Sequence, residues 1–301
     1  MRVAAIDCGT NAIRLLIADV NGAELVDVSR RMEIVRLGEG VDRTGRLSPT
    51  AIGRTRRALI GYAAEIAELG ITAVRMVATS ASRDAANAAD FSAMVHSVLG
   101  IEPEVITGDE EARLSFTGAV GGLTAEAPYL VVDIGGGSTE FVTGVSTSEQ
   151  AISVDIGCVR MTERHFAADP ATPAEIAAAR RDITAAVDTA LAAVPGRSAK
   201  TLVGLAGSVT TVTALALGLS SYDGSRIHHS TVSYAEVAKV TASLLSATVA
   251  SRLALGVMHP GRADVIGAGA LILEIIMERS GLQSVVASEH DILDGIAFGL
   301  A

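Results

Sequence analysis

The sequence is poor in aromatic residues, cysteine and lysine. Of its 301 residues only 3% are aromatic and none is tryptophan, whereas 49% are hydrophobic. A core must therefore be built mainly from Ala, Val, Leu and Ile, which suits parallel strands flanked by helices and leaves little bulk for an aromatic ligand cage. The length suits two domains of about 100–200 residues each.

The two cysteines, Cys8 and Cys158, exclude a disulfide framework, and their spacing matches no metal site. The simplest interpretation is two reduced, buried thiols. The alternative is that oxidation of Cys8 inhibits the protein, because this residue lies inside a loop that we predict to bind phosphate.

Long hydrophobic runs are also missing. The longest apolar stretch, residues 265–277, contains Glu274 and is shorter than the roughly 20 residues of a membrane span. No secretory signal pattern precedes the first apolar strand. We therefore expect a cytoplasmic protein without a membrane partner.

The net charge of −10 disfavours binding to nucleic acid or to an acidic membrane surface. Lys200 and Lys239 are the only lysines, and residues 30–57 contain eight arginines but three acidic residues. Because guanidinium groups match phosphate oxygens in pairs, this segment is either a surface for a polyanion or an ordinary solvated surface.

Two similar motifs lie 126 positions apart, in residues 5–11 (AIDCGTN) and 132–138 (VDIGGGS). Each begins as an apolar strand and ends in Asp-x-Gly followed by small residues, so main-chain N–H groups can approach an anion closely. Asp7 and Asp133 can hold Mg²⁺ or Mn²⁺ beside the phosphate. The predicted phosphate-binding residues of the two loops are Gly9, Thr10, Asn11, Gly135, Gly136, Gly137 and Ser138.

Two further positions have open interpretations. Glu140 either supplies a second carboxylate to the cation at Asp133 or is an exposed strand residue. Gly207 and Ser208 stand where a strand leads into a helix, so they either bind phosphate through the helix N-terminus or only cap it.

A third motif, residues 108–113 (GDEEAR), begins a helix with three acidic residues in a row. Stabilisation of the helix N-terminus by negative charge explains why Asp109 and one further acidic residue stand at this position, but it does not require a third. Hydrolysis of a phosphoanhydride requires a carboxylate that deprotonates water, and the pattern alone does not choose between Glu110 and Glu111. Arg83, at another strand-to-helix junction, is a candidate phosphate clamp.

Alternating strand and helix patterns predict two α/β domains, residues 1–122 and 123–301. In the first we expect strands at 2–6, 13–20, 24–28, 73–78 and 103–106, and helices at 49–69, at 82–99 and from 109. In the second we expect strands at 129–132, 139–145, 150–154, 201–205 and 284–287, and helices at 163–166, 173–193, 206–217, 234–245, 262–278 and 292–300.

In this order and spacing, the motifs resemble those of the exopolyphosphatase/guanosine pentaphosphate phosphatase family over essentially the whole chain. The resemblance implies two RNase H-like domains of the actin-like ATPase superfamily that face a central cleft, with the last helix able to return to the first domain. It also implies a homodimer, Glu111 as the base, Arg83 at the phosphate, and Asp7, Asp133 and Glu140 around Mg²⁺ or Mn²⁺. Asn11 and Ser208 match phosphate-binding positions, whereas Ala12 replaces a serine of the family pattern.

The resemblance further implies release of terminal phosphate from inorganic polyphosphate or, alternatively, from guanosine pentaphosphate. Longer members carry additional C-terminal helical domains, so we expect short-chain polyphosphate as the substrate here. Two different functions also fit the motifs: a non-catalytic sensor of polyphosphate or nucleotide, and a sugar or acetate kinase of the same superfamily.

Overall fold

The computed structural model describes residues 1–301, and the chain forms two compact units. Unit 1 contains Met1–Gly121 together with Asp291–Ala301, and unit 2 contains Gly122–His290. The last eleven residues therefore belong to unit 1 rather than to the second domain of residues 123–301. The reason is that α13 (Ile292–Phe298) packs on α5 (Gly108–Val120) and on β1 (Arg2–Cys8), where its apolar side chains are buried.

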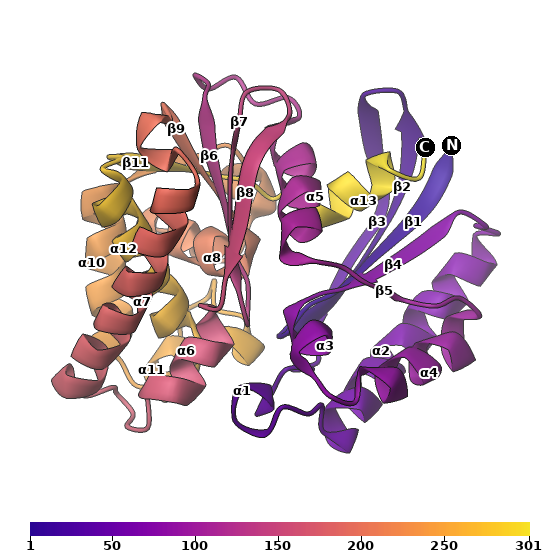
Figure 1. The fold of residues 1–301 in the computed structure, drawn as a ribbon, viewed down its shortest axis with the longest axis horizontal. Coiled ribbons are helices and arrows are strands. Elements are labelled where there is room, and N and C mark those ends of the chain that lie inside the picture. Colours follow the sequence, from indigo (N-terminus) through magenta and orange to yellow (C-terminus); the bar gives the residue numbers. More distant parts are fainter. The chain divides into compact units, whose positions relative to one another are not determined.

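Unit 1 is built on a five-stranded sheet in the order β3-β2-β1-β4-β5. Its remaining strands are β2 (Ala12–Asn21), β3 (Glu24–Ile34), β4 (Val74–Ala78) and β5 (Glu104–Val105). Its remaining helices are α1 (Val41–Thr44), α2 (Pro49–Glu68), α3 (Ser80–Asp84) and α4 (Ala88–Leu99). Figure 1 shows α2 and α4 on one face of this sheet and α5 and α13 on the other.

Both faces of β1 are buried, as its continuous apolar sequence requires. Ala4 and Ile6 point into the cluster formed with α2 and α4, whereas Val3 and Ala5 point into the cluster formed with α13. This alternation is the period-two pattern of a strand. It places Asp7 next to the last residue of β1, a strand that is buried from Val3 to Cys8.

Unit 2 is built on a six-stranded sheet in the order β10-β11-β9-β6-β7-β8. The strands are β6 (Tyr129–Ile134), β7 (Thr139–Gly144), β8 (Ser148–Val154), β9 (Thr201–Leu205), β10 (Thr231–Ser233) and β11 (Ser284–Ala287). The helices are α6 (Cys158–His165), α7 (Pro173–Ala193), α8 (Ala206–Ala216), α9 (Gly224–Ile227), α10 (Tyr234–Ser246), α11 (Val249–Leu253) and α12 (Ile266–Ser280). Almost every residue of α12 is buried, because this helix contacts α6, α7, α8 and α10.

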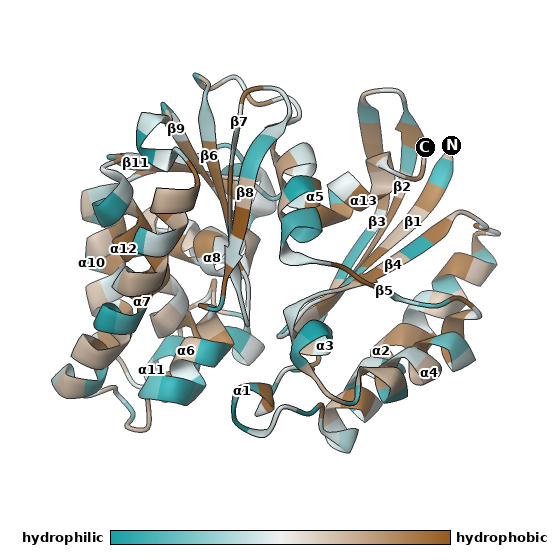
Figure 2. Cartoon of the chain, viewed as in Figure 1, coloured by the Kyte–Doolittle hydropathy of each residue, from teal (hydrophilic) through white to brown (hydrophobic).

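The two sheets repeat one topology. In each, three antiparallel strands in sequence are followed by strands that add in parallel next to the first, β4 beside β1 and β9 beside β6. Figure 2 shows hydrophobic residues along these central strands in both units. The predicted class, a duplicated α/β fold, is confirmed.

Most of the predicted elements are present, with boundaries shifted by a few residues. The hairpin at Asn21-Gly22 forms with Gly22 at φ +62°, and Ser48 caps α2 with Pro49 at its first position. The helix predicted at 82–99 is wrong as one element, because the chain is extended at Ala85 and separates α3 from α4. At this break the Asn87 side chain exchanges two hydrogen bonds with the Leu47 backbone.

Several short elements were not predicted, namely α1, α9, α11 and β10. Each has five residues or fewer, too short for a periodic pattern to show. None of the helices combines the length and the hydropathy of a bilayer-spanning helix.

Candidate functional site

The two Asp-x-Gly loops have the same backbone construction. In the first, the N–H of Gly9 donates to the carbonyl of Ala12 at 2.9 Å, and in the second the N–H of Gly135 donates to the carbonyl of Ser138 at 3.1 Å. Each glycine lies two positions after its Asp, and each acceptor lies five positions after it. The repeat seen in the sequence is therefore a repeat of loop geometry, once per unit.

Each Asp also faces the residue seven positions later on the neighbouring strand. Asp7 lies opposite Arg14 in the β1–β2 pair, and Asp133 lies opposite Glu140 in the β6–β7 pair. Side chains directly opposite one another in an antiparallel pair share a face of the sheet. The first loop therefore balances its carboxylate with a guanidinium, whereas the second places two carboxylates side by side.

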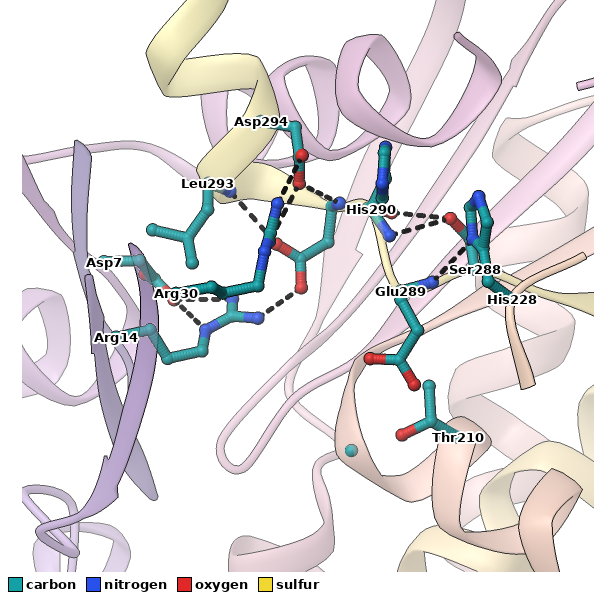
Figure 3. Close-up of polar contacts among 12 residues, drawn as sticks. Asp7, Arg14, Arg30, Thr210, His228, Ser288, Glu289, His290, Leu293 and Asp294 are labelled. Atoms are coloured by element: carbon teal, nitrogen blue, oxygen red, sulfur yellow. Dashed lines mark hydrogen bonds and ion pairs between the residues drawn. The ribbon is translucent and has the colours of Figure 1, made fainter. Parts of the chain in front are cut away.

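Asp7 is 5% exposed, and its Oδ2 accepts hydrogen bonds from Arg14 Nε at 3.1 Å and Nη2 at 2.7 Å. Figure 3 shows Arg14 beside Asp7. The other oxygen, Oδ1, is buried and accepts no hydrogen bond. Burial raises the pKa of Asp7, and the Arg14 guanidinium opposes that rise. An orphaned buried carboxylate oxygen is costly unless a ligand or cation completes it.

The neighbouring side chains of the first loop are partly engaged. The Thr10 hydroxyl hydrogen-bonds the Ser80 hydroxyl at 2.8 Å in the interior. Asn11 Oδ1 is buried without a partner, and the Asn11 carbonyl accepts from the N–H groups of Val35 and Arg36. A phosphate at this loop would meet the main-chain N–H groups rather than a free threonine hydroxyl.

The triple-glycine loop is oriented by the N-terminus of α6. The carbonyls of Gly135 and Gly136 accept from the first N–H groups of this helix at 2.9–3.1 Å, and the carbonyl of Gly137 accepts from Arg160 Nε at 2.6 Å. In a trans peptide the N–H points opposite to the preceding carbonyl. The N–H groups of Gly136, Gly137 and Ser138 therefore point away from α6, and they donate no backbone hydrogen bond.

Glu140 is 1% exposed, so the interpretation as an exposed strand residue is wrong. Its Oε1 accepts from the Ser153 hydroxyl at 2.7 Å. Asp133, on the opposite strand, is 8% exposed. Two buried carboxylates on one face of a sheet repel each other unless a proton or a cation lies with them.

Glu110 and Glu111, between which the sequence could not choose as the base, differ in burial and in their arginine partners. Glu110 is half-exposed and its Oε1 pairs with Arg75 Nη2 at 2.9 Å. Glu111 is 9% exposed and its Oε2 pairs with Arg83 Nη1 at 3.3 Å. The same Arg83 atom donates to the carbonyl of Ile106 at 3.0 Å. Thr107, not Asp109, caps this helix through its side chain.

Residues of α3 connect Glu111 to the first phosphate loop. The N–H of Thr79 donates to the carbonyl of Cys8 at 3.2 Å, and the Ser80 hydroxyl is hydrogen-bonded to the Thr10 hydroxyl. Arg83, three residues further along α3, reaches Glu111. In unit 1 the structure therefore brings Asp7, its loop, Arg83 and Glu111 to one region around the start of α3.

The start of α8 is the matching junction in unit 2. Ala206 adopts φ +65°, an uncommon conformation for a residue with a side chain and one that often marks functional sites. A Cβ on Gly207 would overlap the guanidinium of Arg262, so this glycine makes room for that arginine. The Ser208 side chain is buried against Gly269 of α12, and its N–H belongs to the first turn of α8, where N–H groups have no acceptor within the helix.

Arg14 and Arg262 were missed by sequence reasoning. Arg14 stands on a strand that reads as ordinary apolar β structure, and Arg262 stands in a turn far along the chain from the glycine it contacts. The arginine-rich segment 30–57 is not a single free cationic surface, because Arg30, Arg31 and Arg54 form ion pairs with acidic residues.

The carboxylate oxygens of the two Asp-x-Gly loops suit a hard divalent cation such as Mg²⁺. No group of three or more His, Cys, Asp or Glu side chains is arranged to hold a metal by itself. Mg²⁺ is usually held by one or two carboxylates, with waters and substrate phosphates completing its shell. Each unit supplies such oxygens, the orphaned Oδ1 of Asp7 in unit 1 and the Asp133–Glu140 pair in unit 2.

Burial makes Cys8 an unreactive thiol. Cys8 is 1% exposed, and burial raises its pKa well above the usual value, so little thiolate forms at neutral pH. We expect that native protein treated with millimolar peroxide keeps its activity and that Cys8→Ser behaves like the wild type in this respect. Mass spectrometry of the native protein should show no oxidation at Cys8, and rapid inactivation that Cys8→Ser prevents would contradict this expectation.

Comparison with known proteins shows the family of the chain. Residues 16–301 match the model of the Ppx/GppA phosphatase family. The chain is 52% identical to Exopolyphosphatase 2 of Mycobacterium tuberculosis over 100% of this chain and 98% of that protein.

Among solved structures, an exopolyphosphatase-like protein superposes with a TM-score of 0.96 at 42% identity, covering 99% of this chain and 97% of that one. The PPX-GPPA enzyme of Aquifex aeolicus superposes with a TM-score of 0.83 at 32% identity, covering 99% of both chains. The similarity in sequence and in fold extends over both units. The chain belongs to the Ppx/GppA phosphatase family.

Proposed function

We propose that this protein is an exopolyphosphatase that releases terminal orthophosphate from inorganic polyphosphate, with short chains as the preferred substrate. The proposal rests mainly on the position of Glu111, whose carboxylate is buried at the N-terminus of α5 and pairs with Arg83. Glu110, half-exposed and paired with Arg75, is not held in a buried position of this kind. The relatives named as exopolyphosphatases support the choice of substrate.

In the proposed reaction Glu111 orients a water molecule and accepts its proton as the oxygen attacks the terminal phosphorus. Arg83 neutralises charge that develops on the phosphoryl oxygens, and the N–H groups of the Asp-x-Gly loops bind phosphate. The leaving group is the shortened polyphosphate. In unit 2 Asp133 and Glu140, and in unit 1 Asp7, are the carboxylates that would hold Mg²⁺ or Mn²⁺, and a bound cation would offset phosphate charge.

A phosphate-release assay tests this function. Purified protein is incubated with polyphosphates of about 3 to 100 phosphates, and separately with guanosine pentaphosphate, in Mg²⁺ or Mn²⁺ and in excess EDTA. We expect orthophosphate from the short polyphosphates, and none after EDTA. Faster turnover of guanosine pentaphosphate would identify the alternative substrate. Tight binding of polyphosphate without phosphate release would instead support a sensor, and phosphate transfer to a sugar or acetate would support a kinase.

We also propose that the protein acts as a homodimer in the cytoplasm. The family resemblance supports the dimer, and the two free, buried cysteines fit a reducing compartment. Light scattering coupled to gel filtration measures the mass directly, and a monomer at micromolar concentration would refute the dimer. Cell fractionation with an antibody against the protein tests the compartment.

A further inference from the structure

Arg14 is shared between two carboxylates that are far apart in the sequence. Its Nε and Nη2 donate to Asp7 Oδ2, and its Nη1 donates to Asp291 Oδ2. Asp291 is 4% exposed and is the first residue of the segment that returns to unit 1. One guanidinium therefore faces two buried carboxylates, and the trio carries a net charge of −1.

The position of Asp291 is set independently of Arg14. Its Oδ1 caps α13 by accepting from the N–H of Leu293 at 3.1 Å, and its N–H donates to Asp294 Oδ2 at 2.9 Å. Its carbonyl lies where a Cβ on Gly118 of α5 would be, so the two helices meet closely. The Asp291 carboxylate is thus held in a fixed position, where it accepts from Arg14 Nη1.

We propose that Asp291 is a positioning residue that tunes the cation affinity of Asp7 by sharing Arg14. An Asp7–Arg14 pair alone would be neutral, and its carboxylate would attract a divalent cation weakly. Because Asp291 takes one nitrogen of the guanidinium, Asp7 keeps part of its charge, and its Oδ1 remains without a hydrogen-bond donor. This inference rests on the proposed function, in which Asp7 helps to hold the cation.

Asp294 provides a matched control. It is fully buried on the same helix and takes part in the same capping box, and it pairs with Arg30 of β3 at 2.7 Å. Figure 3 shows this Arg30–Asp294 pair near the Asp7–Arg14 pair. Asp294→Asn, like the Asp291 substitutions, removes one buried negative charge and weakens one pair with an arginine. The arginine affected is Arg30, which makes no hydrogen bond to Asp7, so the Asp7–Arg14 contact is not changed directly. The amide oxygen introduced by Asp294→Asn can still accept from the Asp291 N–H, so Asp291 keeps its position and the control separates sharing of Arg14 from loss of charge or stability.

The test measures cation binding without substrate. Mn²⁺ is titrated calorimetrically into wild type, Asp291→Asn, Asp291→Ser and Asp294→Asn, and the apparent melting temperature is measured with and without Mn²⁺. Asn and Ser both keep an N-cap acceptor, so the Asp291 variants should fold. We expect the Asp291 variants to bind Mn²⁺ about 10-fold or more weakly, in the range seen when a residue supporting a metal ligand is removed. Asp294→Asn should bind within about threefold of wild type.

Activity assays give a second readout. In the Asp291 variants the Mn²⁺ concentration for half-maximal activity should rise by the same factor, while the KM for polyphosphate at saturating Mn²⁺ stays unchanged. Equal Mn²⁺ affinities in wild type and the Asp291 variants, or equal losses in the Asp291 and Asp294 variants, would overturn the inference while leaving the hydrolase assignment intact. A wild type that neither binds Mn²⁺ nor releases phosphate would overturn the proposed function and this inference with it.

Discussion

Glu111→Gln should lower kcat for phosphate release by about 10²–10⁴-fold, the range by which a general base accelerates proton transfer. The substitution keeps the size of the side chain and its ability to accept a hydrogen bond from Arg83, but the amide cannot take a proton from water. KM should change little, because the loops and arginines that bind phosphate are untouched. Steady-state kinetics with short polyphosphate at saturating Mg²⁺ measure both constants.

Glu110→Gln is the matched control for this experiment. Glu110 is the preceding residue on α5, and its partner Arg75 keeps a second ion pair with Glu104 at 2.7 Å. We expect this variant to retain kcat within about threefold, since exposed ion pairs contribute about 0–1 kcal/mol. Equal losses in the two variants would mean that helix stability, not proton transfer, explains the effect. Full activity in Glu111→Gln would remove Glu111 from the reaction.

Gly157→Ala should lower kcat/KM by about 10²-fold, the scale expected when a reacting group is displaced by about 1 Å. A Cβ at this position would lie far inside contact distance of the backbone of Gly136 and Gly137. Backbone atoms cannot swing aside, so the loop must move and its N–H groups lose their orientation. Gly157 has an extended φ of −151°, so the effect comes from crowding and not from backbone strain.

The control for Gly157→Ala is Gly53→Ala in the interior of α2. No atom lies within 4 Å of a Cβ built on Gly53, so the substitution causes no crowding. Alanine in a helix is about 0.5–1 kcal/mol more favourable than glycine, and the apparent melting temperature should rise slightly with unchanged activity. If Gly157→Ala kept wild-type kcat/KM, close contact between α6 and the triple-glycine loop would have no role in phosphate binding.

Much of the fold was predictable because its signals are local. The Asn21-Gly22 hairpin, the Ser48-Pro49 helix start and strand Thr201–Leu205 depend on a few neighbouring residues, and all three are found as expected. The break between α3 and α4 was not predictable from helix propensity, because its cause is a contact between Asn87 and Leu47. Short elements such as α1 and β10 have too few residues to show a period.

The sequence by itself determined that two Asp-x-Gly loops end two strands and that acidic residues begin α5, since glycine chemistry and strand alternation act over a few residues. Only the tertiary structure decided that Glu111, rather than Glu110, is buried beside an arginine, because successive helix residues face different neighbours. The tertiary structure also brought Arg14 to Asp291 across 277 positions. Such pairs depend on how β2 and α13 pack, and no local pattern encodes that contact.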